Sequence, residues 1–406
     1  MKKAVINEKM YSLGAKSSVI REIFEYGRQR KSEIGADKVF DFSLGNPSVP
    51  APEVVGERLS SLISNTDSVK LHGYTSAVGD LEVRKKIAEY INEKHNASAT
   101  ADRIYMTVGA AASLTVSLNA IVNEGDEVIV VAPFFPEYRV FAEKAGAVLK
   151  VVPSSMPDFQ LDLDALESAV NEKTKAIIIN SPNNPSGVVL TEETIRSLAA
   201  LLEKKQAEYE SSIYVISDEP YRELVYGGVD VPYIPNFYDN TIVCYSFSKS
   251  LSIPGERIGY IFVSPRADLS KEIYLAVCGA GRALGFVCAP ALFQYLVADC
   301  LGKTADISVY KKNRDLLYNS LTELGFEAAR PDGAFYLFVK SPEPDAKAFC
   351  ERAKKYEILI VPSDDFGVSG YVRISYCVTT QQIEGSLAGF ESLAREYGLG
   401  GKSNGK

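Results

Sequence analysis

Between about residues 100 and 265, short apolar runs alternate with segments of helical periodicity. The pattern predicts helices over 109–122 and after Thr191, a good N-cap residue. It predicts strands over 103–108, 127–132, 148–152, 175–180, 213–217, 241–245 and 257–263. Apolar strands separated by helices are typical of a mostly parallel sheet with helices on both faces. We therefore expect an α/β fold for this part of the chain.

The chain after about residue 300 follows a different pattern. Long helical patterns and a few strands indicate a smaller α+β unit; the helices are expected at 307–324, 346–355 and 382–397 and the strands at 333–339 and 371–376. A chain of 406 residues is also too long for one compact core. We expect an N-terminal arm with a small-domain segment, a large cofactor-binding domain and a small C-terminal domain, at 1–45, 46–290 and 291–406.

Charge and composition narrow the function. The net charge is −8 and the isoelectric point about 5.2, which argues against a nucleic-acid or anionic-membrane surface. The six cysteines form no Cys-x-x-Cys pair, which is typical of reduced thiols rather than a disulfide frame or a zinc site. We expect no signal peptide, because no apolar stretch follows Met1, and no run approaches the ~18 apolar residues of a membrane helix. We expect a cytoplasmic protein without a bound metal.

Histidine is scarce in this chain. His72 and His95 are the only two, and we expect His95 to face solvent because its neighbours are polar. This scarcity disfavours Ser-His-Asp hydrolysis and most catalytic zinc sites.

One segment places a lysine close to hydroxyl side chains and an arginine. Lys249 follows Ser246 and Ser248, and Arg257 comes after it in a run that contains two glycines. A lysine amine can form a Schiff base with an aldehyde cofactor, while hydroxyls and a guanidinium can hold the cofactor's phosphate. The spacing predicts pyridoxal-phosphate chemistry.

Three further segments carry suitable groups at the ends of predicted strands. Gly109-Ala110-Ala111 begins a helix, whose free N–H groups can bind a phosphate. Asn184 lies in the loop after the strand at 175–180, and Asp218 and Tyr221 follow the strand at 213–217. Ligands in open α/β sheets bind beyond the carboxyl ends of the strands, so we expect these groups to share one site with Lys249.

Taken together, these motifs resemble those of a known enzyme family. The Asn-Asn-Pro-x-Gly loop at 183–187, the Asp-x-x-Tyr pair and the Ser-x-Ser-Lys…Gly-x-Arg run are similar to those of class I/II aminotransferases, which are fold-type I pyridoxal-phosphate enzymes like the aspartate aminotransferases. The resemblance runs from about Phe42 to the last helices. It implies pyridoxal 5'-phosphate as cofactor. It also implies amino transfer between an L-amino acid and a 2-oxo acid, in a ping-pong cycle through the pyridoxamine form.

The resemblance also implies roles for residues around the cofactor ring. Lys249 would form the Schiff base and then carry the proton between substrate and cofactor. Asp218 would keep the ring nitrogen protonated, since a carboxylate beside that cation favours both charged forms. Asn184 and Tyr221 would bind the phenolic oxygen, and Phe135 would stack on the ring face.

Further residues would hold the phosphate and the substrate. The phosphate set is Ser246, Ser248, Arg257 and the amides of Gly109, Ala110 and Ala111. The family often has Ser or Thr where Ala110 and Ala111 stand, so we expect weaker phosphate binding there. Arg373 matches the arginine that clamps the substrate α-carboxylate, and Gly45 a segment that covers the substrate.

The resemblance predicts a partner subunit as well. Tyr74 matches a tyrosine that reaches the phosphate of the neighbouring subunit, which implies a homodimer with shared active sites. No clear match exists for a residue that binds a distal substrate carboxylate, although Arg282 is a candidate.

Other functions fit less well. The residues of Ser246–Lys249 also satisfy the Ser-x-x-Lys motif of penicillin-binding enzymes, but the companion motifs are absent. Regulators with aminotransferase-like domains carry a DNA-binding module in front, and only about 40 residues precede the motifs here. The main alternative is a β-eliminating lyase of the C–S lyase type, because the same residues serve that reaction and the sequence does not reveal which bond at Cα breaks.

Overall fold

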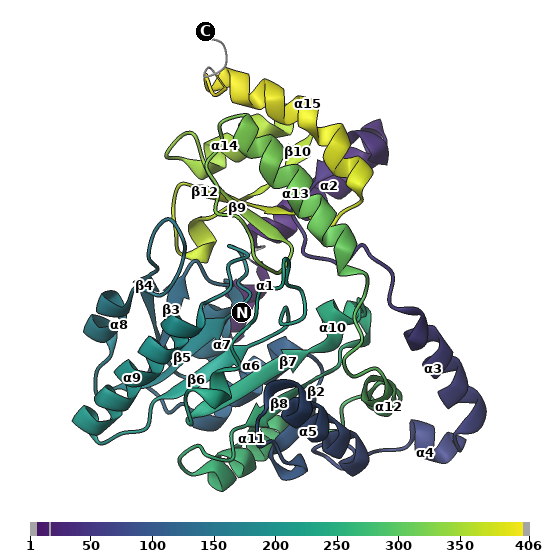
Figure 1. Cartoon of the computed structure of the whole chain (residues 1–406), viewed down its shortest axis with the longest axis vertical. Helices are drawn as coiled ribbons and strands as arrows, with labels where there is room; N and C mark the ends of the chain where they lie inside the picture. The colour runs from purple at the N-terminus through teal and green to yellow at the C-terminus, as the bar shows by residue number, and fades with distance from the viewer. Residues whose placement is uncertain (1–5, 16–17, 401–406) are drawn as a thin grey trace, which may run out of the picture. The chain divides into compact units, whose positions relative to one another are not determined.

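The computed structural model describes residues 6–15 and 18–400, and the chain divides into two compact units (Figure 1). The larger unit consists of residues 47–311 and 329–335. The smaller consists of the described residues up to 46, residues 312–328 and residues 336–400. The predicted boundary at 290 falls between helices α11 (Ser270–Leu284) and α12 (Ala291–Asp299), and both belong to the larger unit.

A seven-stranded sheet forms the centre of the larger unit. Its strand order is β2-β8-β7-β6-β5-β3-β4. The bounds are β2 Ile104–Thr107, β3 Glu127–Ala132, β4 Val148–Pro153, β5 Thr174–Asn180, β6 Tyr214–Asp218, β7 Thr241–Ser246 and β8 Gly259–Val263. Strand β8 runs antiparallel to β2 and β7, and the other pairs are parallel. The mostly parallel sheet that the sequence predicts is confirmed.

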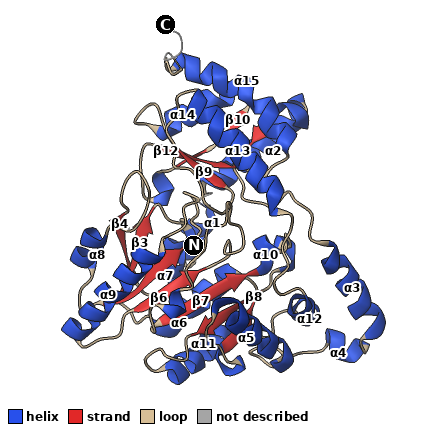
Figure 2. Cartoon of the chain, in the orientation of Figure 1, coloured by secondary structure: helices blue, strands red, loops and turns tan. Residues whose placement is uncertain are grey.

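Helices cover both faces of this sheet (Figure 2). On the face that carries Val215 and Val243, apolar residues of α5 (Leu81–His95), α9 (Glu192–Tyr209) and α12 pack against the strands. On the opposite face, Ser117 of α6 (Ala110–Ile121) contacts Cys244 of β7. The central strands read as continuous apolar runs because both of their faces are buried.

The larger unit contains five further helices. They are α3 Glu53–Asn65, α4 Ser68–His72, α7 Glu137–Lys144, α8 Leu163–Ala169 and α10 Phe247–Ser250. The start of α9 is set by its cap: the hydroxyl of Thr191 accepts a hydrogen bond from the Thr194 amide, as its sequence position predicts.

The smaller unit combines a small antiparallel sheet with helices. Its three-stranded sheet has the order β11-β12-β9, and β1 pairs in parallel with β10. The strands are β1 Phe40–Asp41, β9 Tyr336–Lys340, β10 Ile358–Leu359, β11 Val361–Pro362 and β12 Tyr371–Ser375. The helices are α1 Glu8–Ala15, α2 Val19–Ile34, α14 Ala346–Ala353, α15 Thr380–Glu396 and α13 Ile307–Glu323, which crosses the boundary at 311.

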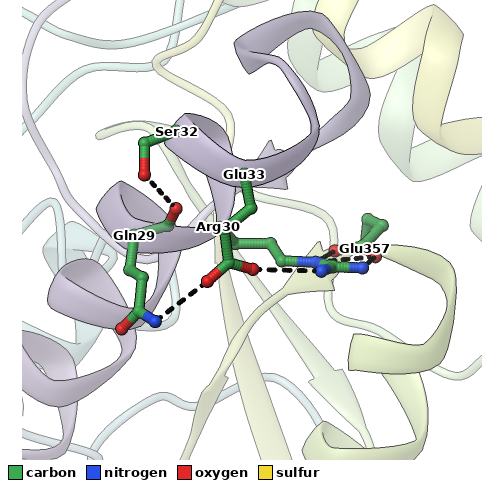
Figure 3. A network of polar contacts seen from close by, with 5 residues as sticks. All are labelled: Gln29, Arg30, Ser32, Glu33 and Glu357. Carbon is green, nitrogen blue, oxygen red and sulfur yellow. Dashed lines mark hydrogen bonds and ion pairs between the residues drawn. The ribbon is translucent and has the colours of Figure 1, made fainter.

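A charged network joins α2 to the start of β10 within the smaller unit (Figure 3). Arg30 donates to both carboxylate oxygens of Glu357 and also pairs with Glu33 at 3.2 Å. The two carboxylates raise the pKa of the guanidinium. The contact ties α2 to a segment more than 300 residues away in the sequence.

None of the helices in the described ranges 6–15 and 18–400 is both long and apolar enough to cross a membrane. All six cysteines are free thiols.

Candidate functional site

The predicted cofactor residues meet at one edge of the large sheet. Because β5, β6 and β7 are parallel, their last residues lie side by side, and Asn180 pairs with Asp218 in the strand register. The antiparallel β8 begins at the same edge, where Gly259 pairs with Ser246 of β7 and with Thr107 of β2. The alternation of strands and helices thus delivers side chains from distant segments to a single place.

One end of this edge is built to hold an anion. Arg257 donates from Nη1 to the Ser248 hydroxyl at 3.2 Å, and Ser246 Oγ lies 2.8 Å from Ser248 Oγ. Arg257 itself has a left-handed φ of 49° and stands before β8, so the prediction that it begins the strand was wrong. The turn at 254–257 directs its guanidinium toward the two serines instead.

Helix α6 begins at the same place, directly after Gly109. Gly109 has a φ of 94°, and a Cβ on it would come within 2.7 Å of Arg257 Nη2, so only glycine fits this approach. No side chain caps α6, which leaves the amides of Ala110 and Ala111 available at a helix N-terminus. Guanidinium, two hydroxyls and a helix N-terminus together form a phosphate-binding arrangement.

Asp218 presents a buried carboxylate at the end of β6. The residue is 5% exposed, and its Oδ2 accepts a hydrogen bond of 2.5 Å from the Tyr138 hydroxyl. Its Oδ1 is also buried and has no hydrogen-bond partner in the described part of the chain. Burial raises the pKa of Asp218 from 3.8 to about 7, although the bond from Tyr138 lowers it. Such a group is stabilised by a cationic donor placed against Oδ1.

The ring nitrogen of pyridoxal phosphate is a donor of this kind, so the residues present fit the cofactor that the motifs predict. The orphan oxygen lies at the sheet edge that also holds the anion-binding end. A buried carboxylate oxygen without a hydrogen-bond partner is costly unless a ligand supplies one.

Lys249 lies in the short helix α10 that follows β7. It is partly buried, and its Nζ is 5.4 Å from the centroid of the Phe335 ring. Tyr221 contacts the same ring edge-to-face, with centroids 5.5 Å apart. Phe335 is therefore a neighbour of two predicted site residues, although no sequence motif pointed to it.

Asn180 connects the loop of Asn184 to Asp218. Its Oδ1 accepts from the Asn184 amide at 2.8 Å, and its Nδ2 donates to the Asp218 carbonyl at 2.9 Å. Asn184 is 5% exposed. Asn180 was missed in the sequence because it looked like the last residue of a strand, yet it sets the positions of two predicted site residues.

Phe134 and Phe135 differ in how deeply they are buried. Phe134 is 3% exposed and belongs to the core, whereas Phe135 is only partly buried. The Phe135 ring contacts Tyr138 edge-to-face at 5.7 Å, so it lies next to the partner of Asp218. The stacking role of Phe135 stays a prediction. Tyr138, three positions further on, gave no signal of its own in the sequence.

The smaller unit contains the other predicted pair, Arg373 and Gly45. Arg373 is 2% exposed, donates to the Ser43 carbonyl at 2.6 Å, and has its guanidinium 4.7 Å from the ring centroid of Tyr336. A second ring, Phe366, lies 5.1 Å from the same guanidinium. A Cβ at Gly45 would overlap the Tyr336 hydroxyl. The flat guanidinium is thus fixed by aromatic contacts and a carbonyl, which suits bidentate recognition of a carboxylate.

The predicted residues therefore fall into separate groups. The larger unit gathers the cofactor set at its sheet edge, and the smaller unit gathers Arg373 with Gly45. Tyr74 joins neither group through a described contact and is 98% exposed. Arg282 is exposed in the last turn of α11.

Comparisons with known proteins found similar sequences and similar solved structures. Residues 37–389 match the family described as "Aminotransferase class I and II". A solved aminotransferase from Eubacterium rectale shares 54% identity, with a TM-score of 0.95 over 97% of this chain and 100% of that one. A probable aspartate aminotransferase of Methanocaldococcus jannaschii is 32% identical over 92% of this chain and 96% of its own. An aspartate aminotransferase from Thermus thermophilus, solved with maleate, is 26% identical, with a TM-score of 0.84 over 96% and 100% of the two chains.

Proposed function

The chain belongs to the class I and II aminotransferase family, and from this premise we propose that pyridoxal 5'-phosphate binds at the edge of its large sheet and that Lys249 carries it. The protein is an aminotransferase, and the family depends on this cofactor. The observation that carries the proposal is the buried Asp218 Oδ1, which lacks a partner at the edge where Lys249 and the anion-binding end also lie.

Each residue of the larger unit has a task in this proposal. When bound, the cofactor supplies an electron sink for the bonds at the substrate Cα. Asp218 holds a proton at the ring nitrogen, and Asn184 and Tyr221 bind the phenolic oxygen. Lys249 moves the proton to and from the substrate Cα, for which it needs its free amine. Phe135 covers one face of the ring, while Arg257, Ser246, Ser248 and the amides of Gly109–Ala111 hold the phosphate.

Arg373 would bind the α-carboxylate that amino acids and 2-oxo acids share. Its fixed, planar guanidinium supports this role, since two parallel N–H···O bonds need that geometry. Gly45 leaves room for Tyr336 beside it, and any larger residue would displace that ring, which contacts the guanidinium.

We also propose a homodimer in the cytoplasm. The nearly complete exposure of Tyr74, an aromatic residue in a segment predicted to reach a neighbouring subunit, supports the dimer. Free thiols at all six cysteines fit a reducing compartment.

The proposed reaction is tested by separating amino transfer from elimination. With an amino acid and a 2-oxo acid present, we expect stoichiometric exchange of the amino group and initial rates that follow ping-pong kinetics. With a β-substituted alanine alone, we expect little release of pyruvate and ammonia. Sustained ammonia release without a 2-oxo acid would contradict the proposal and support the lyase. A panel of dicarboxylic, aromatic and aliphatic amino acids in the same assay would define the side-chain specificity.

Replacement of Arg373 should weaken both substrates. In Arg373→Leu we expect the KM for the amino acid and for the 2-oxo acid to rise together, by about 10–100-fold, because each loses a charge-assisted bidentate contact. The KM values of Arg373→Lys should lie between those of the wild type and of Arg373→Leu. Lysine keeps the positive charge but loses the bidentate geometry of the guanidinium. Steady-state kinetics with each substrate varied in turn measure this.

The matched control is Arg282→Leu, at an exposed position on α11. If Arg282 serves a distal carboxylate, only dicarboxylic substrates should suffer. If it serves none, no KM should change. A rise in KM for only one of the two substrate classes in Arg373→Leu would remove Arg373 from the α-carboxylate site.

A further inference from the structure

A buried ion pair lies next to two of the proposed site residues and has no task in the proposed reaction. Glu219 and Arg222 are 1% and 7% exposed, and Arg222 Nε lies 2.5 Å from Glu219 Oε2. In the sequence they alternate with the site residues Asp218 and Tyr221. Burying two charges is costly, and an apolar pair of similar size is often equally stable, so the presence of this pair calls for another explanation.

The pair lies behind the strand end, on the sheet face opposite Asp218. Ser217 pairs in register with Val243, on the face that α5, α9 and α12 cover. Its hydroxyl donates to Glu219 Oε1 at 2.7 Å, as expected for side chains two positions apart along a strand. Asp218 pairs with Cys244, which faces α6. The ion pair therefore supports the strand end from the side that the cofactor does not use.

The guanidinium of Arg222 is fixed by several further contacts. It donates to the carbonyls of Val231 and Pro232 at 3.0 and 3.1 Å. It also lies 5.1 Å from the centroid of the Tyr233 ring, on which His95 stacks with centroids 4.4 Å apart. His95 is thus partly buried, and the prediction that it faces solvent was wrong. A planar guanidinium held in this way leaves its carboxylate partner little freedom to move.

The same contacts hold the turn that carries both site residues. Tyr221 directly precedes Arg222, and its carbonyl accepts a hydrogen bond from the Leu224 amide at 2.8 Å. We propose that Glu219 and Arg222 are positioning residues. Their ion pair fixes the turn so that the Asp218 carboxylate and the Tyr221 hydroxyl reach the same cofactor ring. This role rests on the proposed function, in which the two groups bind the ring nitrogen and the phenolic oxygen.

The visible absorbance of the bound cofactor reports on the position of Tyr221. A hydroxyl that donates to the phenolic oxygen stabilises its negative charge, and so lowers the pH at which the Schiff base takes up a proton. We therefore expect Tyr221→Phe to move the absorbance transition to higher pH by about one unit. Loss of a residue that only stabilises the fold would leave this transition in place.

The test is the double variant Glu219→Leu with Arg222→Met, loaded with cofactor. It removes both charges together, so no unpaired charge stays buried and the net charge of the protein is kept. We expect it to remain folded, with the absorbance transition moved to higher pH by at least about half a unit. The Kd for the cofactor should rise about three- to tenfold. Added to Tyr221→Phe, the double variant should move the transition no further, because both changes act through one hydroxyl.

Arg222→Lys tests the same role without removing a charge. Lysine keeps the ion pair but cannot reproduce the guanidinium geometry, so the transition should move less than in the double variant. This variant also gives the comparison if the double variant does not fold. The control is Arg30→Met with Glu357→Leu, which removes the ion pair of the smaller unit (Figure 3) and should change neither the transition nor the Kd.

The outcomes separate this inference from the proposed function. If Tyr221→Phe moves the transition while the double variant and Arg222→Lys leave it in place, the pair is not a positioning device and the proposed function stands. A shift that adds fully to that of Tyr221→Phe would also overturn the inference, since the pair would then act elsewhere. If the wild type binds no cofactor, or if Tyr221→Phe changes nothing, the proposed site is wrong and the inference is wrong with it.

Discussion

Lys249→Ala should lose amino transfer and the ability to be joined to the cofactor by borohydride. In the proposed site, the variant would lack both the amine for the Schiff base and the group that would move the proton at the substrate Cα. Positioned proton transfer alone contributes about 10²–10⁴-fold in rate, so we expect kcat to fall by at least that factor. Single-turnover kinetics with added cofactor measure the rate, and mass spectrometry of the borohydride-treated protein locates the label.

The comparison variant is Lys271→Ala, at an exposed position on α11. It should keep both rate and labelling, whereas Lys249→Ala should keep the fold, because Lys249 is a partly buried residue of a four-residue helix rather than a core contact. A small primary amine added to Lys249→Ala should restore part of the proton transfer, since it replaces the missing base without the anchor. Label retained on another lysine in Lys249→Ala would show that the anchor lies elsewhere.

The strand ends were predictable from the sequence because they obey local rules. Apolar runs define β3, β5, β6 and β7, and the register of a parallel sheet then brings their last residues together without any knowledge of contacts. The cap at Thr191 is equally local, since its hydroxyl accepts a hydrogen bond from the amide of Thr194, three residues away. For these reasons the cofactor edge emerged from strand ends alone.

What escaped prediction depends on contacts between distant segments. Tyr138 of α7 and Asp218 at the end of β6 are 80 residues apart in the sequence, and only the folded chain brings them together. The fragment 329–335 returns to the larger unit because the amides of Asp332 and Gly333 donate to the Gly187 carbonyl, and backbone pairing of this kind leaves no residue pattern to detect. It carries Phe335 to Lys249 and Tyr221. The sequence therefore predicted the motif residues but not the residues from distant segments that contact them.

Asp218→Asn should stabilise the cofactor-free protein at pH 8 and destabilise the cofactor-bound protein, each relative to the wild type. In the cofactor-free wild type, burial raises the pKa of Asp218 from 3.8 to about 7, so the folded state holds a proton that the unfolded state has lost between these values. The free energy of unfolding therefore falls by up to about 4 kcal/mol as the pH rises from about 4 to about 7. It stays at the lower value above pH 7. Asparagine carries no charge to bury, so the cofactor-free variant should be more stable than the wild type at pH 8 and equal to it near pH 4.

With the cofactor present, the order should invert. In the proposed site, Asp218 would hold the protonated ring nitrogen, and its buried charge would become part of an ion pair, whereas asparagine would leave that cation without a counter-charge. We expect about a 10–100-fold higher Kd for the cofactor in Asp218→Asn and a kcat at least about a hundredfold lower. Thermal unfolding of both proteins at pH 8, with and without cofactor, shows whether the order of the two melting temperatures changes.

Tyr138→Phe distinguishes the effect of the Asp218 charge from the effect of the hydrogen bond that Asp218 accepts from Tyr138. This variant keeps the carboxylate but removes the 2.5 Å bond that lowers the pKa of Asp218, so that pKa should rise further. The cofactor-free form should then be less stable than the wild type at pH 8, opposite to Asp218→Asn, and the cofactor should restore most of the difference. If both variants move stability in the same direction, the buried charge is not what distinguishes them, and Asp218 would be a structural residue of β6 rather than the counter-ion of the ring.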